Sequence, residues 1–234
     1  MMPIESATVV ERESNAGGHR VRGLSVLRHQ LSRYGLGAGT TYPYGVPMNR
    51  AHLEFCASDE WKDALMQWII PYALNGTDLG ADVLEVGPGP GLVTDILRQH
   101  VPRLTVIELD DVLADQLSAR LADTNVDVIH GDATAMPFED GRFSGAVSFT
   151  MLHHVPSAAL QDRLFAEVAR VLAPAACFVA SDSMGSDELA AFHEDDVYNP
   201  IDPASVEARM HTAGFAQVDV RANEFGWAAT AVRP

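Results

Sequence analysis

The sequence is poor in the residues that several classes of protein need. It has only two cysteines in 234 residues, Cys56 and Cys177, and no CxxC pair, so neither a disulfide framework nor a cysteine zinc site is expected. Lys62 is the only lysine, which disfavours Schiff-base chemistry. No apolar run is long enough to span a membrane, and the first residues include acidic ones where a signal peptide would be apolar. We therefore expect a cytoplasmic protein.

Positive charge is also scarce. The sequence has 16 Lys and Arg residues against 32 Asp and Glu residues, a formal net charge of -16. Residues 1–50 carry six arginines and three glutamates, which leaves a net charge of -19 on the rest. An acidic protein repels nucleic acids and anionic membrane surfaces, so we expect a small-molecule partner and no nucleic acid. The sequence gives no indication of oligomeric state.

Two segments precede the β-rich part of the chain. Residues 1–41 are polar with scattered glycines, and we expect a mobile N-terminal arm. Residues 42–80 predict a helical lid or cap, because Ser58 is a good N-cap and apolar residues then recur at helical spacing. We expect Trp61 and Trp68 of this helix to pack in the core.

From residue 81 onward, short β-rich runs alternate with helical patterns, which is typical of a parallel sheet covered by helices on both faces. The last helix is followed by two closely joined strands, which should pair antiparallel at one edge. The expected strands are residues 83–86, 104–107, 126–129, 146–149, 177–180, 215–221 and 225–232, and the expected helices are residues 92–99, 112–121, 160–172 and 203–211.

A glycine-rich turn follows the first expected strand. Gly87, Gly89 and Gly91 alternate with Pro88 and Pro90. The glycines let the backbone approach a ligand closely, whereas the prolines remove N–H donors that a pyrophosphate would need. The turn is therefore poorly suited to binding an anion.

Acidic residues stand at the ends of the first three strands, where ligands of open parallel sheets bind. Glu85 would repel a phosphate but attract the ammonium and sulfonium groups of S-adenosylmethionine. Glu108 can accept hydrogen bonds from both hydroxyls of a ribose, as in dinucleotide-binding proteins. Asp132 can accept a hydrogen bond from the exocyclic amine of an adenine. The pattern favours S-adenosylmethionine over a dinucleotide.

Together these residues resemble the class I S-adenosylmethionine-dependent methyltransferases, in particular the small-molecule branch related to ubiquinone and menaquinone C-methyltransferases. The resemblance implies an α/β, Rossmann-like, seven-stranded and mostly parallel sheet with an antiparallel last strand, in a methyltransferase domain over residues 81–234. It also implies in-line transfer of a methyl group to a small-molecule acceptor. The matching segments are VLEVGPGPG at 83–91, VIE at 106–108, GDATAMPF at 131–138, MLHHV at 151–155 and EVARVLAP at 167–174.

The resemblance further implies which residues hold the cofactor. The glycine turn with Glu85 would cradle the methionine portion, Glu108 would hold the ribose, and Asp132 with the Ala133 backbone would hold the adenine. The expected cofactor-binding residues are Glu85, Gly87, Pro88, Gly89, Gly91, Glu108, Leu109, Asp132 and Ala133.

Two positions depart from the usual pattern of this family. Ser144-Gly145 stands where Asp-Ala or Asp-Val is usual, and Pro174-Ala175-Ala176 stands where Pro-Gly-Gly is usual. We interpret both as local changes in turns. They leave open a catalytically silent S-adenosylmethionine-binding protein with a regulatory or assembly role, and a nicotinamide-dependent oxidoreductase is a second alternative.

His153 and His154 follow the fourth strand and are the candidate catalytic residues. Either is a possible general base, and the alternative is an ordering or capping role in the turn. A magnesium site of the catechol-methyltransferase kind needs a carboxylate at this strand end, but residues 141–161 contain no Asp or Glu. We therefore expect no metal.

Four further residues are candidates for covering the substrate. Tyr42 and Tyr44 precede the cap helix. They either form part of a lid that closes over cofactor and acceptor, or have only a structural role. His193 and Tyr198 lie in an acidic insertion, which either covers the substrate or is a solvated loop.

Overall fold

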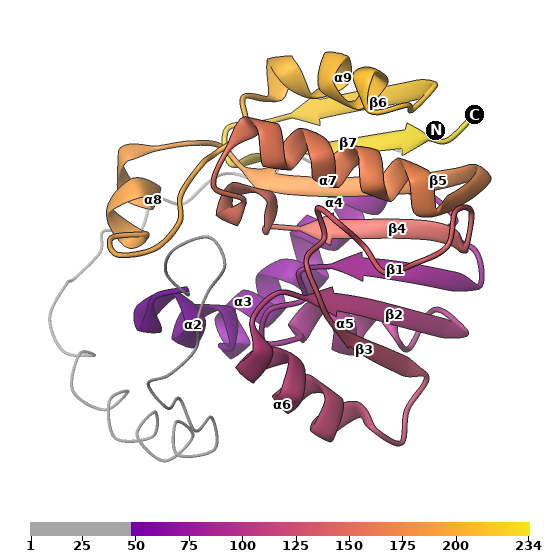
Figure 1. Ribbon diagram of the computed structural model, residues 1–234. Coiled ribbons are helices and arrows are strands. Elements are labelled where there is room, and N and C mark those ends of the chain that lie inside the picture. Colours follow the sequence, from indigo (N-terminus) through magenta and orange to yellow (C-terminus); the bar gives the residue numbers. More distant parts are fainter. Residues whose placement is uncertain (1–47) are drawn as a thin grey trace, which may run out of the picture. The chain divides into compact units, whose positions relative to one another are not determined.

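The computed structural model describes residues 48–234, so the expected N-terminal arm, Tyr42 and Tyr44 lie outside the described residues. Seven strands form one sheet in the order β3-β2-β1-β4-β5-β7-β6 (Figure 1). Their bounds are β1 Asp82–Val86, β2 Arg103–Glu108, β3 Val126–His130, β4 Phe143–Phe149, β5 Leu172–Ser183, β6 Gln217–Ala222 and β7 Gly226–Val232.

The pairing of the strands confirms the expected Rossmann-like sheet. Strands β1 to β5 pair in parallel, whereas β7 runs antiparallel to both β5 and β6. Because β1 pairs with β2 on one side and β4 on the other, the strand order reverses there. In open α/β sheets such a reversal leaves a crevice at the carboxyl ends of the strands, where ligands bind.

Helices cover both faces of the sheet, and neighbouring residues of a strand point to opposite faces. Val83 belongs to a buried cluster with residues of α4, α5 and α6, whereas Leu84 belongs to a second cluster with residues of α7 and α9. The helices are α2 Arg50–Cys56, α3 Asp59–Ala64, α4 Ile70–Leu74, α5 Leu92–Leu97, α6 Asp111–Leu121, α7 Ala158–Val171, α8 Asp187–Phe192 and α9 Pro203–Thr212, with a π turn η2 at Leu65–Ile69 and a 3-10 turn η3 at Leu152–His154.

The expected cap helix is present but changes its winding. Ser58 caps α3 by accepting a hydrogen bond from the Trp61 N–H at 3.1 Å, as expected. The chain then passes through η2 into α4 just before Pro71, which has no N–H to donate to a helical hydrogen bond. In the wider π turn, Ile69 and Ile70 lie on the same face of the helix as the buried Leu65. Trp68, only three positions after Leu65, does not reach that face. The expectation of a core position for Trp68 is wrong, because this side chain is 72% exposed.

Ser144-Gly145 lies inside β4 and not in a turn, so this interpretation of the sequence is wrong. The Ser144 hydroxyl accepts a hydrogen bond from the Asp82 N–H at 2.9 Å and lies 3.0 Å from the Leu79 carbonyl. A Cβ atom on Gly145 would lie 2.4 Å from that carbonyl oxygen. The two small residues let the chain before β1 pass directly beneath β4.

Within residues 48–234, no helix has the length and apolar character needed to cross a bilayer.

Candidate active site

The glycine turn lies between β1 and α5 and has left-handed backbone at all three glycines. Their φ angles are 68° at Gly87, 54° at Gly89 and 88° at Gly91, a region that other residues adopt only with strain. A Cβ atom on Gly87 would lie 2.2 Å from Cγ of Met151, whereas a Cβ atom on Gly89 would meet nothing within 4 Å. The turn therefore packs against Met151 on one side and leaves open space at Gly89.

The Glu108 carboxylate at the end of β2 is bonded to this turn. It accepts hydrogen bonds from the Gly89 N–H at 3.0 Å and the Asp110 N–H at 2.9 Å. Burial raises the pKa of this carboxyl, although the two N–H donors oppose the shift. A carboxylate has about four acceptor positions. Positions that the backbone N–H groups of Gly89, Asp110 and Leu109 do not use remain for a ligand in the cavity that Glu108 lines.

Glu85, in β1, is buried and incompletely bonded. Its side chain is 2% exposed, and Oε2 has no hydrogen-bond partner among the described residues. Burial raises the pKa of this carboxyl to about 8, and the nearby negative charges of Glu108 and Asp95 act in the same direction. The site therefore holds a carboxyl group that a positively charged ligand would ionise.

Asp132 follows β3 and is held in a fixed orientation. The Thr134 N–H donates to its Oδ1 at 2.7 Å, which forms a tight local turn. Asp132 and the adjacent Ala133 line the same cavity as Glu108. The acidic ends of β2 and β3 thus face one space, as the sequence predicts.

Two cavities flank the glycine turn. The strand-end cavity lies over the ends of β1, β2 and β3, and among its lining residues are Glu108, Leu109, Asp132 and Ala133. The glycine-turn cavity is lined by Glu85 and Pro88, among others. Gly87, Gly89, Met151 and His154 line both. Eight of the nine expected cofactor residues are thereby brought together.

Gly91 is the exception, because it lines neither of these two cavities. It is the N-cap of α5, and a Cβ atom there would lie 2.5 Å from Cδ2 of Leu117. Gly91 therefore lets α5 pack closely against α6 and starts the helix in the right direction.

A third cavity, the aromatic cavity, has a volume of about 670 Å³. Trp61 and Thr150 line both the glycine-turn cavity and the aromatic cavity. The glycine-turn cavity and the aromatic cavity are therefore neighbours across Thr150. The walls of the aromatic cavity also include Trp68, Tyr72, Phe225 and Trp227. The Nε1 atom of Trp227 is buried and has no acceptor among the described residues.

The two candidate catalytic histidines occupy different positions. His154 lines the strand-end and glycine-turn cavities, whereas His153 lines none of the three cavities. The Nδ1 atom of His153 lies 2.6 Å from Oδ1 of Asp182, and the His153 N–H donates to Oδ2 of the same carboxylate at 2.9 Å. Burial lowers the pKa of His154 to about 4. The His154 ring is therefore neutral near pH 7.

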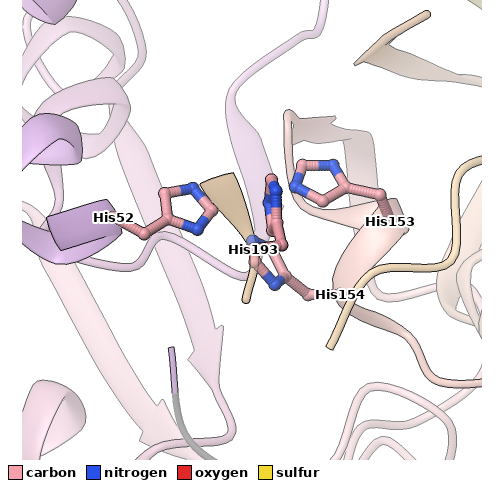
Figure 2. A group of neighbouring side chains, drawn as sticks. All are labelled: His52, His153, His154 and His193. Atoms are coloured by element: carbon pink, nitrogen blue, oxygen red, sulfur yellow. The ribbon is translucent and has the colours of Figure 1, made fainter. Parts of the chain in front are cut away.

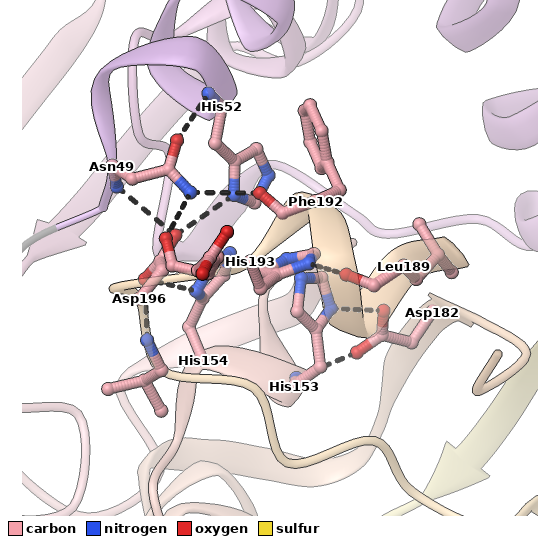
Figure 3. A network of polar contacts seen from close by, with 11 residues as sticks. Asn49, His52, His153, His154, Asp182, Leu189, Phe192, His193 and Asp196 are labelled. Carbon is pink, nitrogen blue, oxygen red and sulfur yellow. Dashed lines mark hydrogen bonds and ion pairs between the residues drawn. The ribbon is translucent and has the colours of Figure 1, made fainter. Parts of the chain in front are cut away.

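The acidic insertion is solvated only in part, since Glu194 and Asp195 are exposed whereas its histidine and its last aspartate are held inside. His193 is 4% exposed, and the Asp196 carboxylate contacts Nδ1 of His52 at 3.1 Å and Nδ1 of His154 at 3.5 Å. Figure 3 shows these contacts, which join α2, η3 and the segment after α8. Tyr198 stacks behind them, with its ring centroid 4.5 Å from that of His193.

Sequence analysis missed two carboxylates in this network. Asp182 stands near the end of β5, so the argument used for the ends of the first three strands would have found it. Asp196 lies in the insertion, and its partner His52 is 144 residues away in the chain. No local pattern indicates that contact.

Comparisons with known proteins agree with this geometry. Residues 84–180 match the family model described as "Methyltransferase domain". A probable S-adenosylmethionine-dependent methyltransferase of Mycolicibacterium smegmatis is 29% identical over 147 residues, which cover 60% of this chain and 54% of the relative. A probable ribosomal RNA small subunit methyltransferase A of Methanothermobacter thermautotrophicus is 35% identical over 122 residues, which cover 47% and 42%. The chain thus spans about half the length of these relatives.

Solved structures share the fold. The phosphoethanolamine N-methyltransferase 2 of Haemonchus contortus in complex with S-adenosyl-L-methionine superposes with a TM-score of 0.58 at 16% identity, over 74% of this chain and 53% of that one. At this identity the likeness shows the fold alone. The branch related to ubiquinone C-methyltransferases stays a prediction. Residues 84–180 are thus similar to a methyltransferase domain, and the fold is the one seen in solved S-adenosylmethionine-dependent methyltransferases.

Proposed function

We propose that this protein transfers the methyl group of S-adenosylmethionine to a small-molecule acceptor. The observation that carries the proposal is the Glu85 carboxyl, which is buried in the wall of the glycine-turn cavity with Oε2 unbonded. Leaving a buried polar atom without a partner costs about 1–3 kcal/mol. A positively charged ligand that donates hydrogen bonds would remove this cost, and the methionine portion of the cofactor carries such a group.

The other residues expected to bind the cofactor would contact its ribose and its adenine. Glu108 would hold the ribose with its free acceptor positions, and Asp132 with the Ala133 backbone would hold the adenine. Gly89 adds open space where a side chain would otherwise stand. Leu109 and Pro88 would contribute apolar contacts from the cavity walls.

When bound, S-adenosylmethionine supplies a methyl group that its positively charged sulfur already activates. The residues of this chain therefore have two tasks, which are to align the acceptor with the methyl group and to exclude water. Holding two reactants in a reactive orientation is worth up to about 7–11 kcal/mol. A general base is needed only for an acceptor that is not already ionised. The assignment of His153 or His154 as that base stays a prediction.

The aromatic cavity is the best candidate for the acceptor site. It adjoins the glycine-turn cavity across Thr150 and Trp61, so an acceptor there would approach the donor from the methionine side. Its walls are mostly apolar, and five of the twelve residues that line it are aromatic. These features favour a flat, apolar acceptor.

RNA is the second candidate acceptor, because one of the partial relatives is a probable ribosomal RNA methyltransferase. The charge of the chain argues against it. Residues 51–234 carry a net charge of -19, whereas binding to nucleic acid relies on Lys and Arg contacts with phosphates.

Labelled donor distinguishes these possibilities. The full chain would be incubated with S-adenosylmethionine carrying a tritiated methyl group and with a cell extract separated into small-molecule and RNA fractions. We expect label in the small-molecule fraction, and much less label with Asp132→Ala at a donor concentration near the dissociation constant of the wild type. Label in RNA would overturn the small-molecule assignment. Binding of the donor without any transfer would favour the silent binding protein.

A further inference from the structure

Four imidazole rings, three buried and one half-buried, meet beside the strand-end and glycine-turn cavities. His52 comes from α2, His153 and His154 from η3, and His193 from the residue after α8 (Figure 2). One ring nitrogen from each residue can be chosen so that all four lie within 4.8 Å of one another. We propose that these four histidines bind one divalent transition-metal ion.

Unbonded nitrogen atoms are the first support for this site. The Nε2 atoms of His153, His154 and His193 are buried and have no hydrogen-bond partner among the described residues. Buried polar atoms nearly always have a partner, and each missing one costs about 1–3 kcal/mol. A single metal ion would satisfy these nitrogens together.

The opposite ring nitrogens provide the second support. Nδ1 of His153 lies 2.6 Å from the Asp182 carboxylate, and Nδ1 of His193 lies 2.6 Å from the Leu189 carbonyl oxygen. Such contacts fix Nδ1 as the N–H donor, so that Nε2 keeps its lone pair. Histidine ligands of metals typically make this second contact.

Asp196 completes the same arrangement for the other two rings. Its Oδ2 lies 3.1 Å from Nδ1 of His52, and its Oδ1 lies 3.5 Å from Nδ1 of His154 (Figure 3). With Asp182, two buried carboxylates stand directly behind the rings. Their negative charges would balance a dication in the low-dielectric interior.

The chemistry of the ligands selects the class of metal. Imidazole nitrogens suit zinc, copper, nickel and iron, whereas magnesium and calcium prefer oxygen ligands. Tetrahedral zinc with Zn–N distances of about 2.1 Å has ligand nitrogens about 3.4 Å apart. The widest separation here would shorten by about 1.4 Å on binding. From the sequence we expect no metal, because no Asp or Glu follows the fourth strand. The site proposed here uses histidine ligands, so that reason does not apply to it.

An ion at this site would join segments that are distant in the chain. His52 precedes the sheet, and His193 follows the last parallel strand. Met48 and Leu53, beside and within α2, line the strand-end cavity together with His154. The ion would therefore fix α2 and the insertion at the wall of the cofactor cavity. The inference does not depend on methyl transfer taking place, but it excludes one part of the proposed function, because a metal-bound His153 or His154 has no free nitrogen to act as the general base.

Zinc binding tests the proposal directly. The full chain would be stripped with chelator, dialysed and titrated with Zn²⁺ alone, with the bound metal measured by mass spectrometry. We expect one Zn²⁺ per chain, and a cobalt-loaded protein should show the visible absorption of a tetrahedral nitrogen-ligated site. His193→Ala should weaken zinc binding at least tenfold, and Asp182→Asn should weaken it by about 10–100-fold.

His211→Ala is the matched control. This histidine lies at the end of α9, where its ring contacts the Phe215 carbonyl oxygen and lies 3.8 Å from Glu207. It therefore reports adventitious binding at the surface and should leave the zinc affinity unchanged. Circular dichroism would establish that each variant is folded. The proposal is overturned if the wild-type chain binds no zinc, or if folded His193→Ala binds as much zinc as His211→Ala.

Discussion

At the residue scale, Glu85 is the most informative side chain of the site. Burial raises the pKa of its carboxyl to about 8, the charges of Glu108 and Asp95 add to the shift, and the Thr94 hydroxyl opposes it. The carboxyl is therefore largely protonated at pH 7 in the free protein. A cationic ligand favours the carboxylate, so binding must release a proton.

We predict that the affinity for S-adenosylmethionine rises by up to about tenfold per pH unit as the pH increases to about 8. Above this pH the affinity should level off. Glu85→Gln removes the titrating group and should flatten this rise. The ligand has its own α-amino group, which titrates near pH 7.7–8.0 in peptides, so the difference between the two proteins is the relevant quantity. Calorimetry at several pH values measures it, and parallel curves for both proteins would refute the prediction.

The same carboxyl gives a stability prediction of opposite sign. Because its pKa is higher in the folded protein than the usual 4.5, its contribution to stability is complete below about pH 4.5 and is lost as the pH rises to about 8. Glu85→Gln should therefore become progressively more stable than the wild type between these pH values. Urea unfolding at pH 5 and pH 8.5 measures the difference, which should be larger at pH 8.5.

At the element scale, the glycine turn offers a matched pair of substitutions. Both Gly87 and Gly89 have left-handed backbone, so alanine costs about 1–2 kcal/mol at either position. At Gly87 the new Cβ would also clash with Met151, and overpacking adds about 1–3 kcal/mol. Gly87→Ala should therefore lower the free energy of unfolding more than Gly89→Ala.

Gly89→Ala should also change the affinity for ligand, which backbone strain alone would not do. A Cβ atom on Gly89 would meet nothing within 4 Å, and Gly89 lines both the strand-end and glycine-turn cavities, so we expect weaker binding of S-adenosylmethionine to Gly89→Ala. Equal unfolding energies for the two variants, or unchanged affinity in Gly89→Ala, would contradict this description of the turn.

A residue with left-handed backbone near the start of β5 provides a second prediction at this scale. Pro174-Ala175-Ala176 lies inside this strand and not in a turn, so the interpretation of this segment as a turn is wrong. Ala175 has a φ of 66°, at a position where the resembling family usually has glycine. Ala175→Gly should stabilise the protein by about 0.5–1 kcal/mol, because the left-handed strain of alanine outweighs the added flexibility of glycine. Ala176, the next residue, does not have positive φ and serves as the control. Thermal unfolding should show Ala176→Gly to be destabilised, and a loss of stability in Ala175→Gly would contradict the prediction.

Most elements of the sheet could be predicted from the sequence, because each buried strand is a continuous apolar run with turn residues at its ends. The π turn was not predictable in this way. Helical spacing assigned Trp68 to the buried face, but the wider winding before Pro71 turns this side chain toward solvent. Strand β5 is also longer than expected, because it begins at Leu172, directly after α7.

At the scale of the whole molecule, the sequence could predict that the residues expected to bind cofactor lie together, but not the histidine cluster. The residues expected to bind cofactor follow strand ends, which the parallel sheet brings to one edge. The four histidines and two carboxylates belong to segments whose meeting depends on how α2 and the insertion pack. His153 and Asp182, for example, are 29 residues apart and meet only because β4 and β5 pair.

Charge and cavity shape act together at this scale. The strongly acidic chain disfavours anionic partners, and within it the cavities combine acidic groups with apolar walls. A cationic donor beside an apolar aromatic cavity fits this combination.

Calorimetric titration of the full chain with S-adenosylmethionine, and in parallel with NAD⁺, tests the central claim most directly. We predict that S-adenosylmethionine binds and NAD⁺ does not. Asp132→Ala should weaken the binding by about 1–3 kcal/mol, whereas Asp127→Ala, which removes an exposed carboxylate at the opposite end of β3, should leave it unchanged. Binding of NAD⁺ without binding of S-adenosylmethionine would contradict the account.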